Sequence, residues 1–407
     1  MTGIPSEERA MSSDTYADSQ RKIPRDGAGA GCPVSVDAEG VWHVPGYAAA
    51  RAVLRSTDTR QGGFGVDDAG DLPGKMRPPV LWRDGPEHRE DRRQTARFFT
   101  PRRVDEKYRG LMHRFADEQC ERLRRRGTAD LSQLSFALAV AVAGEVIGLT
   151  PARRGMARRL ERFFTEHRSA PGWRTPGGIY RMAYMNSALA AFYLADVAPA
   201  IRVRRRRRRD DLISHLLDQG CNNGDIFGEC VTFAAAGMAT TREFITVAAW
   251  HLFTDAGLRT RYLDGDQAAR AAILHELLRL EPVVGNLARW TTAELELPGE
   301  DGPVTIPAGA RVDVVVAAAN LDPAAVGDRP TQLCPGRPLG DGVADAGLAF
   351  GDGPHRCPGA HIAVQETDIF LTKLFAMPNL RMVQPPRSRI RAMISSYELN
   401  GLIVTVR

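Results

Sequence analysis

Cys357 lies in the segment whose residue types most clearly indicate chemistry. From 350 to 363 the chain reads Phe-Gly-Asp-Gly-Pro-His-Arg-Cys-Pro-Gly-Ala-His-Ile-Ala. A helix is predicted to begin at the proline after Cys357, because proline is favoured at the first helical position. The sulfur would then face free N–H groups and the positive end of the helix dipole, which favour a thiolate. Gly351 and Gly353 permit a tight bend around the sulfur and Phe350 can cover it, so the pattern suits a metal ligand better than an exposed nucleophile.

Three other interpretations of Cys357 stay open on these residues alone. A lone cysteine is commonly a small buried hydrophobic residue. A dinucleotide-binding fingerprint would need a third glycine where Arg356 stands, and no parallel β-α-β pattern surrounds the segment. A zinc site would need three or four ligands, and only His355 and His361 lie near in the sequence.

Two pairs of charged or titratable residues share helix faces. His88 and Arg92 are four residues apart on a helix predicted to begin at Pro86, so their side chains point the same way. Glu276 and Arg279 are three apart, so they can be buried together and hold the chain that precedes Cys357. For the first pair a solvated helix face is the alternative, because further arginines surround it: Arg89, Arg93 and Arg97.

Gly237 and Thr240 lie inside a long apolar helix predicted over 226–255. A glycine in mid-helix costs about 1 kcal/mol relative to alanine. The Thr240 hydroxyl can donate to the carbonyl four residues earlier and loosen the helical hydrogen bonding. Such a groove can admit a diatomic ligand, although a threonine in a core helix is usually inert.

Helical periodicity dominates the chain that must position these residues. Further helices are predicted at 47–55, 86–99, 104–126, 131–148, 151–168, 179–204, 210–217, 267–280 and 358–375. Strands are predicted at 41–44 and 402–406, and a hairpin at 304–306 and 312–316 around Pro307-Ala308-Gly309. The first 35 residues are polar and are predicted to be a mobile leader. Residues 36–407 are predicted to form one mainly α domain with small β-sheets.

The cysteine segment resembles the heme-binding loop of the cytochrome P-450 family, F-G-x-G-x-H-x-C-x-G-x-x-x-A. The resemblance implies a triangular-prism heme-thiolate fold and a heme b cofactor (iron protoporphyrin IX), with Cys357 as the iron ligand. Phe350, Gly351 and Gly359 occupy the family's loop positions. The family's E-x-x-R is matched by Glu276 and Arg279, a structural pair. The family's heme propionate contacts are matched by His88, Arg92, Arg289 and His355.

The segment Ala236-Gly237-Met238-Ala239-Thr240-Thr241 resembles the family's A-G-x-x-T-T. The resemblance implies that Gly237 and Thr240 are catalytic positions. Thr240 would assist oxygen binding and proton delivery. The family usually carries an acid just before this threonine, where Ala239 stands, and Glu243, one turn on, is a candidate substitute. Hydroxylation is therefore expected beside an alternative, oxidative coupling or another non-hydroxylating oxidation. Weak candidates for the substrate pocket are the loop at 61–83, Ala235, Met238, Val284, Leu287 and Ile394.

Composition limits the remaining function classes. The net charge is +5, but a run of arginines between 202 and 209 alone contributes seven positive charges, so a nucleic-acid-coating surface is not indicated. The run is read as a solvated helix end, with a nucleic-acid or membrane patch as the alternative.

Six sparse cysteines and no signal or membrane-spanning segment predict a cytoplasmic location.

The resemblance also implies the partners. They are a small organic substrate, O2, and an acidic ferredoxin or flavodoxin that passes electrons from NAD(P)H through a reductase. Natural-product tailoring is the expected setting, and a monomer with no nucleic acid or membrane is expected. Loose candidates for the docking surface are Arg103, Arg356 and Lys373. A non-catalytic heme sensor or carrier, which would use the same cysteine, is the outside alternative.

Overall fold

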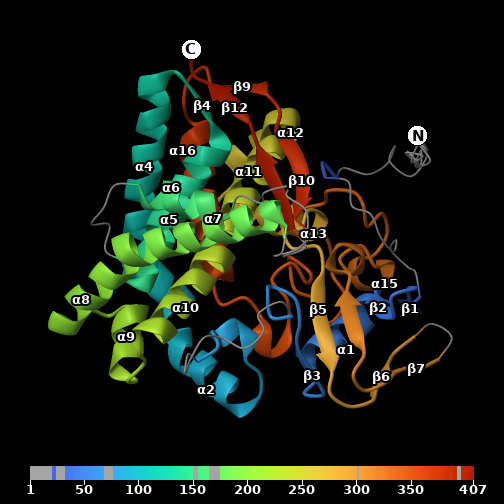
Figure 1. Ribbon diagram of the computed structural model, residues 1–407. Helices are drawn as coiled ribbons and strands as arrows, with labels where there is room; N and C mark the ends of the chain where they lie inside the picture. The colour runs from blue at the N-terminus through green and yellow to red at the C-terminus, as the bar shows by residue number, and fades with distance from the viewer. Residues whose placement is uncertain are drawn as a thin grey trace, which may run out of the picture.

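The computed structural model describes residues 21–23, 33–67, 77–149, 155–164, 175–299, 302–391 and 396–407. Helices fill most of it, and the five-stranded sheet lies with α1 at the lower right of the view (Figure 1). The helices of the first half are α1 (Tyr47–Arg55), α2 (Gly85–Thr95), α3 (Pro101–Arg103), α4 (Arg109–Arg126), α5 (Leu131–Ile147), α6 (Met156–Phe164), α7 (Pro176–Phe192) and α8 (Ala198–Arg206). Those of the second half are α9 (Leu212–Asp218), α10 (Asn223–Phe233), α11 (Thr240–Thr254), α12 (Ala256–Asp264), α13 (Gln267–Leu280), α14 (Val316–Ala319), α15 (Pro323–Val326) and α16 (Ala360–Phe375).

Short 3₁₀ and π-helical segments extend or join several helices. The 3₁₀ turns are Val80–Trp82, Ala96–Phe98 and Gly353–His355, and the π-helical segments are Val104–Tyr108, Tyr193–Val197 and Ala234–Ala239. The last of these joins α10 to α11, so that 223–254 form one helix, called the central helix below. It coincides closely with the helix predicted over 226–255.

The core is built around helices that are apolar on every side. α5 has almost no polar face, and it packs against α4 and α11 with Leu134, Leu138 and Val142 at most 1% exposed. Truncating one such leucine to alanine costs about 2–5 kcal/mol in proteins generally. This packing holds the central helix in place, and with it the residues on its opposite face.

The sheets differ from the predicted hairpin. The five-stranded sheet runs β1 (Ser35–Val36), β2 (Val41–Val44), β8 (Arg311–Val314), β5 (Leu287–Thr291) and β3 (Thr59–Gln61), and only β2 and β8 pair in parallel. β7 (Val304–Ile306) pairs instead with β6 (Leu295–Leu297). The prediction that 304–306 pairs with 312–316 is therefore wrong. β8 lies between β2 and β5, so its backbone is hydrogen-bonded on both sides and Val312 and Val314 are buried. A hairpin with β7 would pair the backbone of β8 on one side only.

Two smaller sheets complete the fold at the C-terminal end of the chain. They consist of β10 (Arg387–Arg391) with β11 (Ser396–Asn400), and of β4 (Thr128–Asp130), β12 (Ile403–Thr405) and β9 (Arg381–Gln384). The terminal strand predicted at 402–406 is β12. No helix in the described parts of the chain is both long and apolar enough to cross a membrane.

Part of the predicted leader contacts the folded body. Ile23 is 1% exposed, and the Arg21 guanidinium donates to the carbonyl oxygens of Leu280 (2.7 Å) and Ala317 (2.6 Å). Ser35 pairs with β2. Residues 1–20 and 24–32 lie outside the described residues, so the boundary at 35 stays a prediction.

Candidate active site

The loop that ends at Cys357 is closed by a backbone hydrogen bond. The Cys357 N–H donates to the carbonyl oxygen of Phe350 at 2.8 Å. Gly351 and Gly353 adopt positive φ angles, +67° and +65°. A Cβ on Gly353 would also lie 2.2 Å from the Leu54 carbonyl oxygen, so a side chain there would collide with the last turn of α1. The predicted tight bend is therefore present, and its second glycine is required sterically.

The Cys357 sulfur lies beside the start of α16. The helix begins at Ala360, two residues later than predicted, with Gly359 preceding it. Burial raises the pKa of the Cys357 thiol, while the N–H groups of Gly359 and Ala360 and the charges of Arg92 and Arg356 oppose that rise. The side chain is nevertheless accessible to solvent. The thiol can therefore be reached by a bound group, as a ligand to such a group must be.

His88 and His355 stack against each other next to this loop. Their ring centroids are 4.1 Å apart at an interplanar angle of 16°. His355 Nε2 lies 2.8 Å from Asp84 Oδ1, whereas His88 Nδ1 is buried with no hydrogen-bond partner among the described residues. Burial, followed by the nearby charge of His355, lowers the pKa of His88 to about 4. His88 is therefore neutral at pH 7 and has one polar atom free for a ligand.

Arg289 and Arg92 bring positive charge to the same place. Arg289 is 3% exposed, and burial lowers its pKa to about 10, with Asp84 opposing. Its guanidinium donates to the carbonyl of the preceding residue at 2.8 Å. Arg92 donates to the Arg356 carbonyl oxygen, and burial lowers its pKa too. Arg289 is buried near Asp84 and Arg92 is half-buried, so this cluster fits a group that carries carboxylates of its own, as heme does.

Asp84 connects the start of α2 to the cysteine loop and to β3. It precedes the helix, but its side chain makes no capping hydrogen bond. Oδ2 accepts from the Gln61 N–H at 2.9 Å, and Oδ1 pairs with His355. Burial would raise the pKa of Asp84, but these two contacts lower it overall. Sequence reasoning missed this residue because nothing local signals a partner so far along the chain.

Glu276 and Arg279 form the predicted buried pair. Two hydrogen bonds, at 2.7 and 2.8 Å, join the guanidinium to both carboxylate oxygens, and the side chains are 0% and 3% exposed. Arg279 also donates to the carbonyls of Asn320 and Pro330 at 2.8 Å each. Arg337, which the sequence did not single out, pairs with Glu276 at 3.1 Å. The pair holds the meander before the cysteine loop, as expected.

Thr240 lies where the central helix changes from π-helical to α-helical geometry. Its hydroxyl donates to the Ala236 carbonyl oxygen at 2.5 Å, which confirms the predicted bond to the carbonyl four residues earlier. Ala236 is exposed, and a Cβ on Gly237 would meet nothing within 4 Å. This stretch of an otherwise buried helix therefore borders open space.

Both carboxylate oxygens of Glu243, the candidate substitute for the missing acid, already have hydrogen-bond partners. One carboxylate oxygen is bound by Arg242 (Nε to Oε1, 2.8 Å), and the other accepts from the Leu399 N–H at 2.8 Å. Burial raises its pKa, with Arg242 opposing, and the side chain is 2% exposed. Its charge is used to join the central helix to β11.

The residues predicted to line the substrate pocket differ in their exposure. Val284 and Leu287 are partly exposed, and Leu287 approaches the cysteine loop, its Cδ1 lying 3.7 Å from where a Gly351 Cβ would be. Ala235 is partly exposed on the π-helical segment. Met238, in contrast, is 0% exposed and packs in an apolar cluster with Phe136 and other core residues. Ile394 lies outside the described residues.

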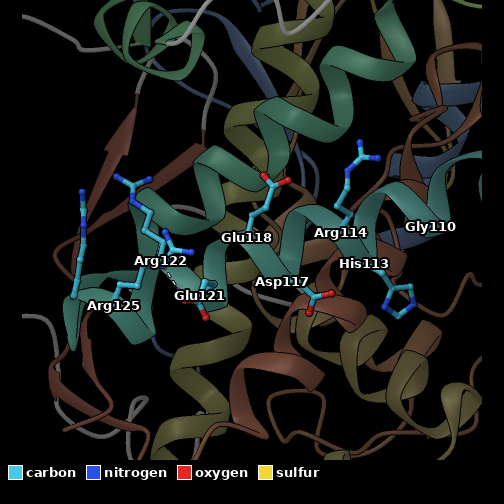
Figure 2. A pocket seen from close by; sticks show the side chains of 9 residues that line it. Gly110, His113, Arg114, Asp117, Glu118, Glu121, Arg122 and Arg125 are labelled. Carbon is cyan, nitrogen blue, oxygen red and sulfur yellow. Dashed lines mark hydrogen bonds and ion pairs between the residues drawn. The ribbon is translucent and has the colours of Figure 1, made fainter.

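Two charged surfaces lie apart from these residues. A hollow along α4 is lined by none of the predicted site residues but by charged ones that include His113, Arg114, Asp117, Glu118, Glu121 and Arg122 (Figure 2). In the arginine run, Arg204 is 3% exposed and paired with Asp211, and Arg208 pairs with Asp218 at 2.6 Å. The run is therefore only partly the solvated helix end that was predicted.

Comparison with known proteins places the chain among heme enzymes. A model of the cytochrome P450 family matches residues 270–395. Erythromycin C-12 hydroxylase of Saccharopolyspora erythraea is 29% identical over 379 residues, which are 88% of this chain and 87% of that protein. Cytochrome P450-SOY of Streptomyces griseus is 30% identical over 362 residues, 86% of this chain and 82% of that protein.

Solved structures agree with the sequence comparison. The cytochrome P450 enzyme CYP109B1 from Bacillus subtilis has a TM-score of 0.74 at 24% identity, covering 92% of this chain and 96% of that one. CYP109E1 from Bacillus megaterium, solved in complex with corticosterone, has a TM-score of 0.75 at 21% identity, covering 92% and 95%. The predicted mainly α heme-thiolate fold with small sheets is confirmed.

Proposed function

Because this chain belongs to the cytochrome P450 family, we propose that it hydroxylates a small organic molecule in the tailoring of a natural product. Membership makes the protein a heme-thiolate monooxygenase, and its relatives include Erythromycin C-12 hydroxylase and pentalenic acid synthase. Heme supplies an iron centre that activates O2 with two electrons and inserts one oxygen atom into the substrate. The observation that carries the proposal is the exposed Cys357 thiol, with the half-buried guanidinium of Arg92 near it and the buried guanidinium of Arg289 in the same cluster of residues.

The residues of the cysteine loop bind and shield the cofactor. Cys357 is the iron ligand, and the N–H groups of Gly359 and Ala360 stabilise its negative charge. Phe350 limits the access of water to the sulfur, and Gly351 provides the bend. The heme carboxylates are bound by His88, Arg92, Arg289 and His355, which lie together next to the loop.

Thr240 and Gly237 would assist the binding of O2 once the cofactor is bound. Gly237 leaves space for O2, and the Thr240 hydroxyl donates a hydrogen bond and passes on a proton there. Because position 239 carries no acid and Glu243 is already bound, the proton reaches Thr240 from water or from the substrate. This feature favours a second candidate, oxidative coupling or another non-hydroxylating oxidation by the same cofactor. Ala235, Val284 and Leu287 remain candidates for the substrate pocket.

Electrons come from NAD(P)H through a reductase and an acidic ferredoxin or flavodoxin. Of the three cations considered for docking, Arg103 and Lys373 are in ion pairs with Asp210 and Asp117, whereas Arg356 is exposed next to Cys357. Arg356 is therefore the preferred contact.

All five described cysteines are free, which supports a reducing compartment such as the cytoplasm.

The absorption spectrum tests the proposed function. The reduced protein with carbon monoxide should show the red-shifted Soret band of a thiolate-ligated heme, and Cys357→Ala should abolish it. Cys334→Ala, which removes another exposed cysteine, should keep the band. A band that persists without Cys357 would overturn the assignment. Turnover with a surrogate ferredoxin and reductase then separates an enzyme from a heme sensor or carrier.

A further inference from the structure

Asp352, inside the cysteine loop, is bound by two arginines of α1. Its Oδ2 accepts from Arg51 Nε at 2.9 Å and from Arg55 Nε at 3.0 Å, although 301 and 297 positions separate these residues in the chain. The two arginines are four residues apart, so they project from one face of the helix. The Asp352 side chain is 17% exposed, whereas those of Arg51 and Arg55 are 28% and 56% exposed. The carboxylate is therefore the shielded partner of both ion pairs.

The other oxygen of Asp352 fixes the turn that leads to Cys357. Oδ1 accepts from the Gly353 N–H at 2.7 Å, at the start of the 3₁₀ turn Gly353–His355. Burial would raise the pKa of Asp352, but the Gly353 N–H and the two arginines lower it overall, so the group is ionised at neutral pH. One carboxylate thus joins the inside of the cysteine loop to α1.

α1 is a firmly held base for this contact. Ala50 and Val53 on the helix are 0% exposed, and the Tyr47 N–H at its start donates to Asp322 Oδ2 at 2.8 Å. The loop also approaches the helix closely, because no side chain fits between Gly353 and the last turn of α1. Breaking the ion pairs would therefore free the loop from an element that is itself fixed.

Asp352 lies between the two ends of the loop that Cys357 closes. The Cys357 N–H donates to the Phe350 carbonyl oxygen at 2.8 Å, and the Arg356 N–H donates to that of Gly353 at 3.1 Å. The turn that Asp352 caps therefore continues directly into the backbone of the cysteine. A change in the position of Asp352 is passed to the sulfur through only a few residues of chain.

We propose that Asp352 is a positioning residue for Cys357, which holds the loop on α1 so that the sulfur stays bound to the heme iron as a thiolate. Two charge-assisted hydrogen bonds orient the carboxylate more firmly than neutral ones would. Asp352 occupies a position that the pattern F-G-x-G leaves open, so this role belongs to the chain's own residues. The role toward iron rests on the proposed function, whereas the attachment of the loop to α1 does not.

The persistence of the thiolate spectrum tests this role. The reduced heme-loaded protein with carbon monoxide is kept in guanidinium chloride below the unfolding transition, where circular dichroism shows the helices intact, and the loss of the red-shifted Soret band is timed. Asp352→Ala should lose the band about fivefold faster than the wild type, because it lacks the cap and both ion pairs. Asp352→Asn keeps an acceptor for the Gly353 N–H and should give an intermediate rate. Asp328→Ala removes an exposed acid outside the loop and should match the wild type.

A general loss of stability would give a different result. If Asp352 only stabilised the fold, the band of Asp352→Ala would disappear together with the helical signal, at the denaturant concentration at which the protein unfolds. That result, or a rate equal to that of the wild type, would overturn the proposal.

Variants of α1 keep the test decisive if Asp352→Ala does not fold. Arg51→Gln should lose the band about threefold faster than the wild type, and Arg55→Gln should have a smaller effect because Arg55 is more exposed. The effects of Arg51→Gln and Asp352→Asn should not add, since both changes break the same ion pair. Additive effects would mean that the two side chains act independently and would contradict the proposal.

Hydrogen exchange separates this proposal from the proposed function. In the protein as purified, amides of residues 350–357 should exchange about fivefold faster in Asp352→Ala than in the wild type, and those of α16 should exchange equally fast in both. Equal exchange in the loop would overturn its attachment to α1 through Asp352. Absence of any red-shifted band in the wild type would contradict the proposed function instead, and the exchange would still decide whether Asp352 holds the loop.

Discussion

Asp84 and His355 are joined by a 2.8 Å contact between Oδ1 and Nε2, although 271 residues separate them in the chain. The contact connects the start of α2 to the loop that carries Cys357. Through its other oxygen Asp84 also holds the backbone of Gln61. One carboxylate thus orients His355, binds the N–H of Gln61 at the end of β3 and offsets part of the positive charge of Arg289.

Asp84→Asn should weaken this junction. Two donors converge on the carboxylate, and asparagine offers one acceptor oxygen and an amino group that repels the second donor. We expect a loss of about 1–3 kcal/mol in the free energy of unfolding of the heme-loaded protein, measured with guanidinium chloride. Glu87→Gln, an exposed change on the same helical turn, should have no measurable effect. An equal effect of both variants would refute a specific role for Asp84.

Arg279→Lys should strongly destabilise the protein even though charge is kept. A lysine cannot make the paired hydrogen bonds to Glu276 and still reach the carbonyls of Asn320 and Pro330. Breaking a buried pair costs about 3–5 kcal/mol, measured as unfolding free energy. Arg93 forms the same i, i+3 pair with Glu90 on an exposed face, so Arg93→Lys should cost less than about 1 kcal/mol. Similar losses would mean that burial does not matter here.

Thr240→Ala should divert reducing equivalents to hydrogen peroxide. The hydroxyl is the polar group that this part of the central helix presents beside Gly237, and alanine cannot donate a hydrogen bond or pass on a proton. The ratio of peroxide released to NADPH oxidised, with a surrogate ferredoxin and reductase, should rise severalfold. Thr254→Ala removes a hydroxyl with the same bond to the carbonyl four residues earlier, and the ratio should not change. Unchanged coupling in Thr240→Ala would remove this residue from the mechanism.

The sequence allowed prediction of features that depend on neighbours in the chain. The bounds of α1 and α13 agree with the predicted ranges 47–55 and 267–280, and the bend before Cys357 and the Glu276–Arg279 pair follow from local spacing. Contacts between distant segments could not be predicted in this way. The bonds of Asp84 to His355, Arg337 to Glu276 and Glu229 to Val80 need the fold to bring their partners together. The mistaken hairpin has the same cause, because a turn does not determine which strands pair.

Glu366 on α16 provides the last prediction, which concerns pH. It is 2% exposed, and burial raises its pKa to about 8, above the unfolded value of 4.5. Its contribution to stability is therefore present below pH 4.5 and lost as the pH rises through 8. Glu366→Gln cannot ionise, so its unfolding free energy relative to the wild type should increase by at least about 1 kcal/mol between pH 5 and pH 9. Glu118→Gln, on the exposed face of α4 (Figure 2), should show no such trend. A constant difference for Glu366→Gln would mean that this carboxyl has a partner that stabilises its charge.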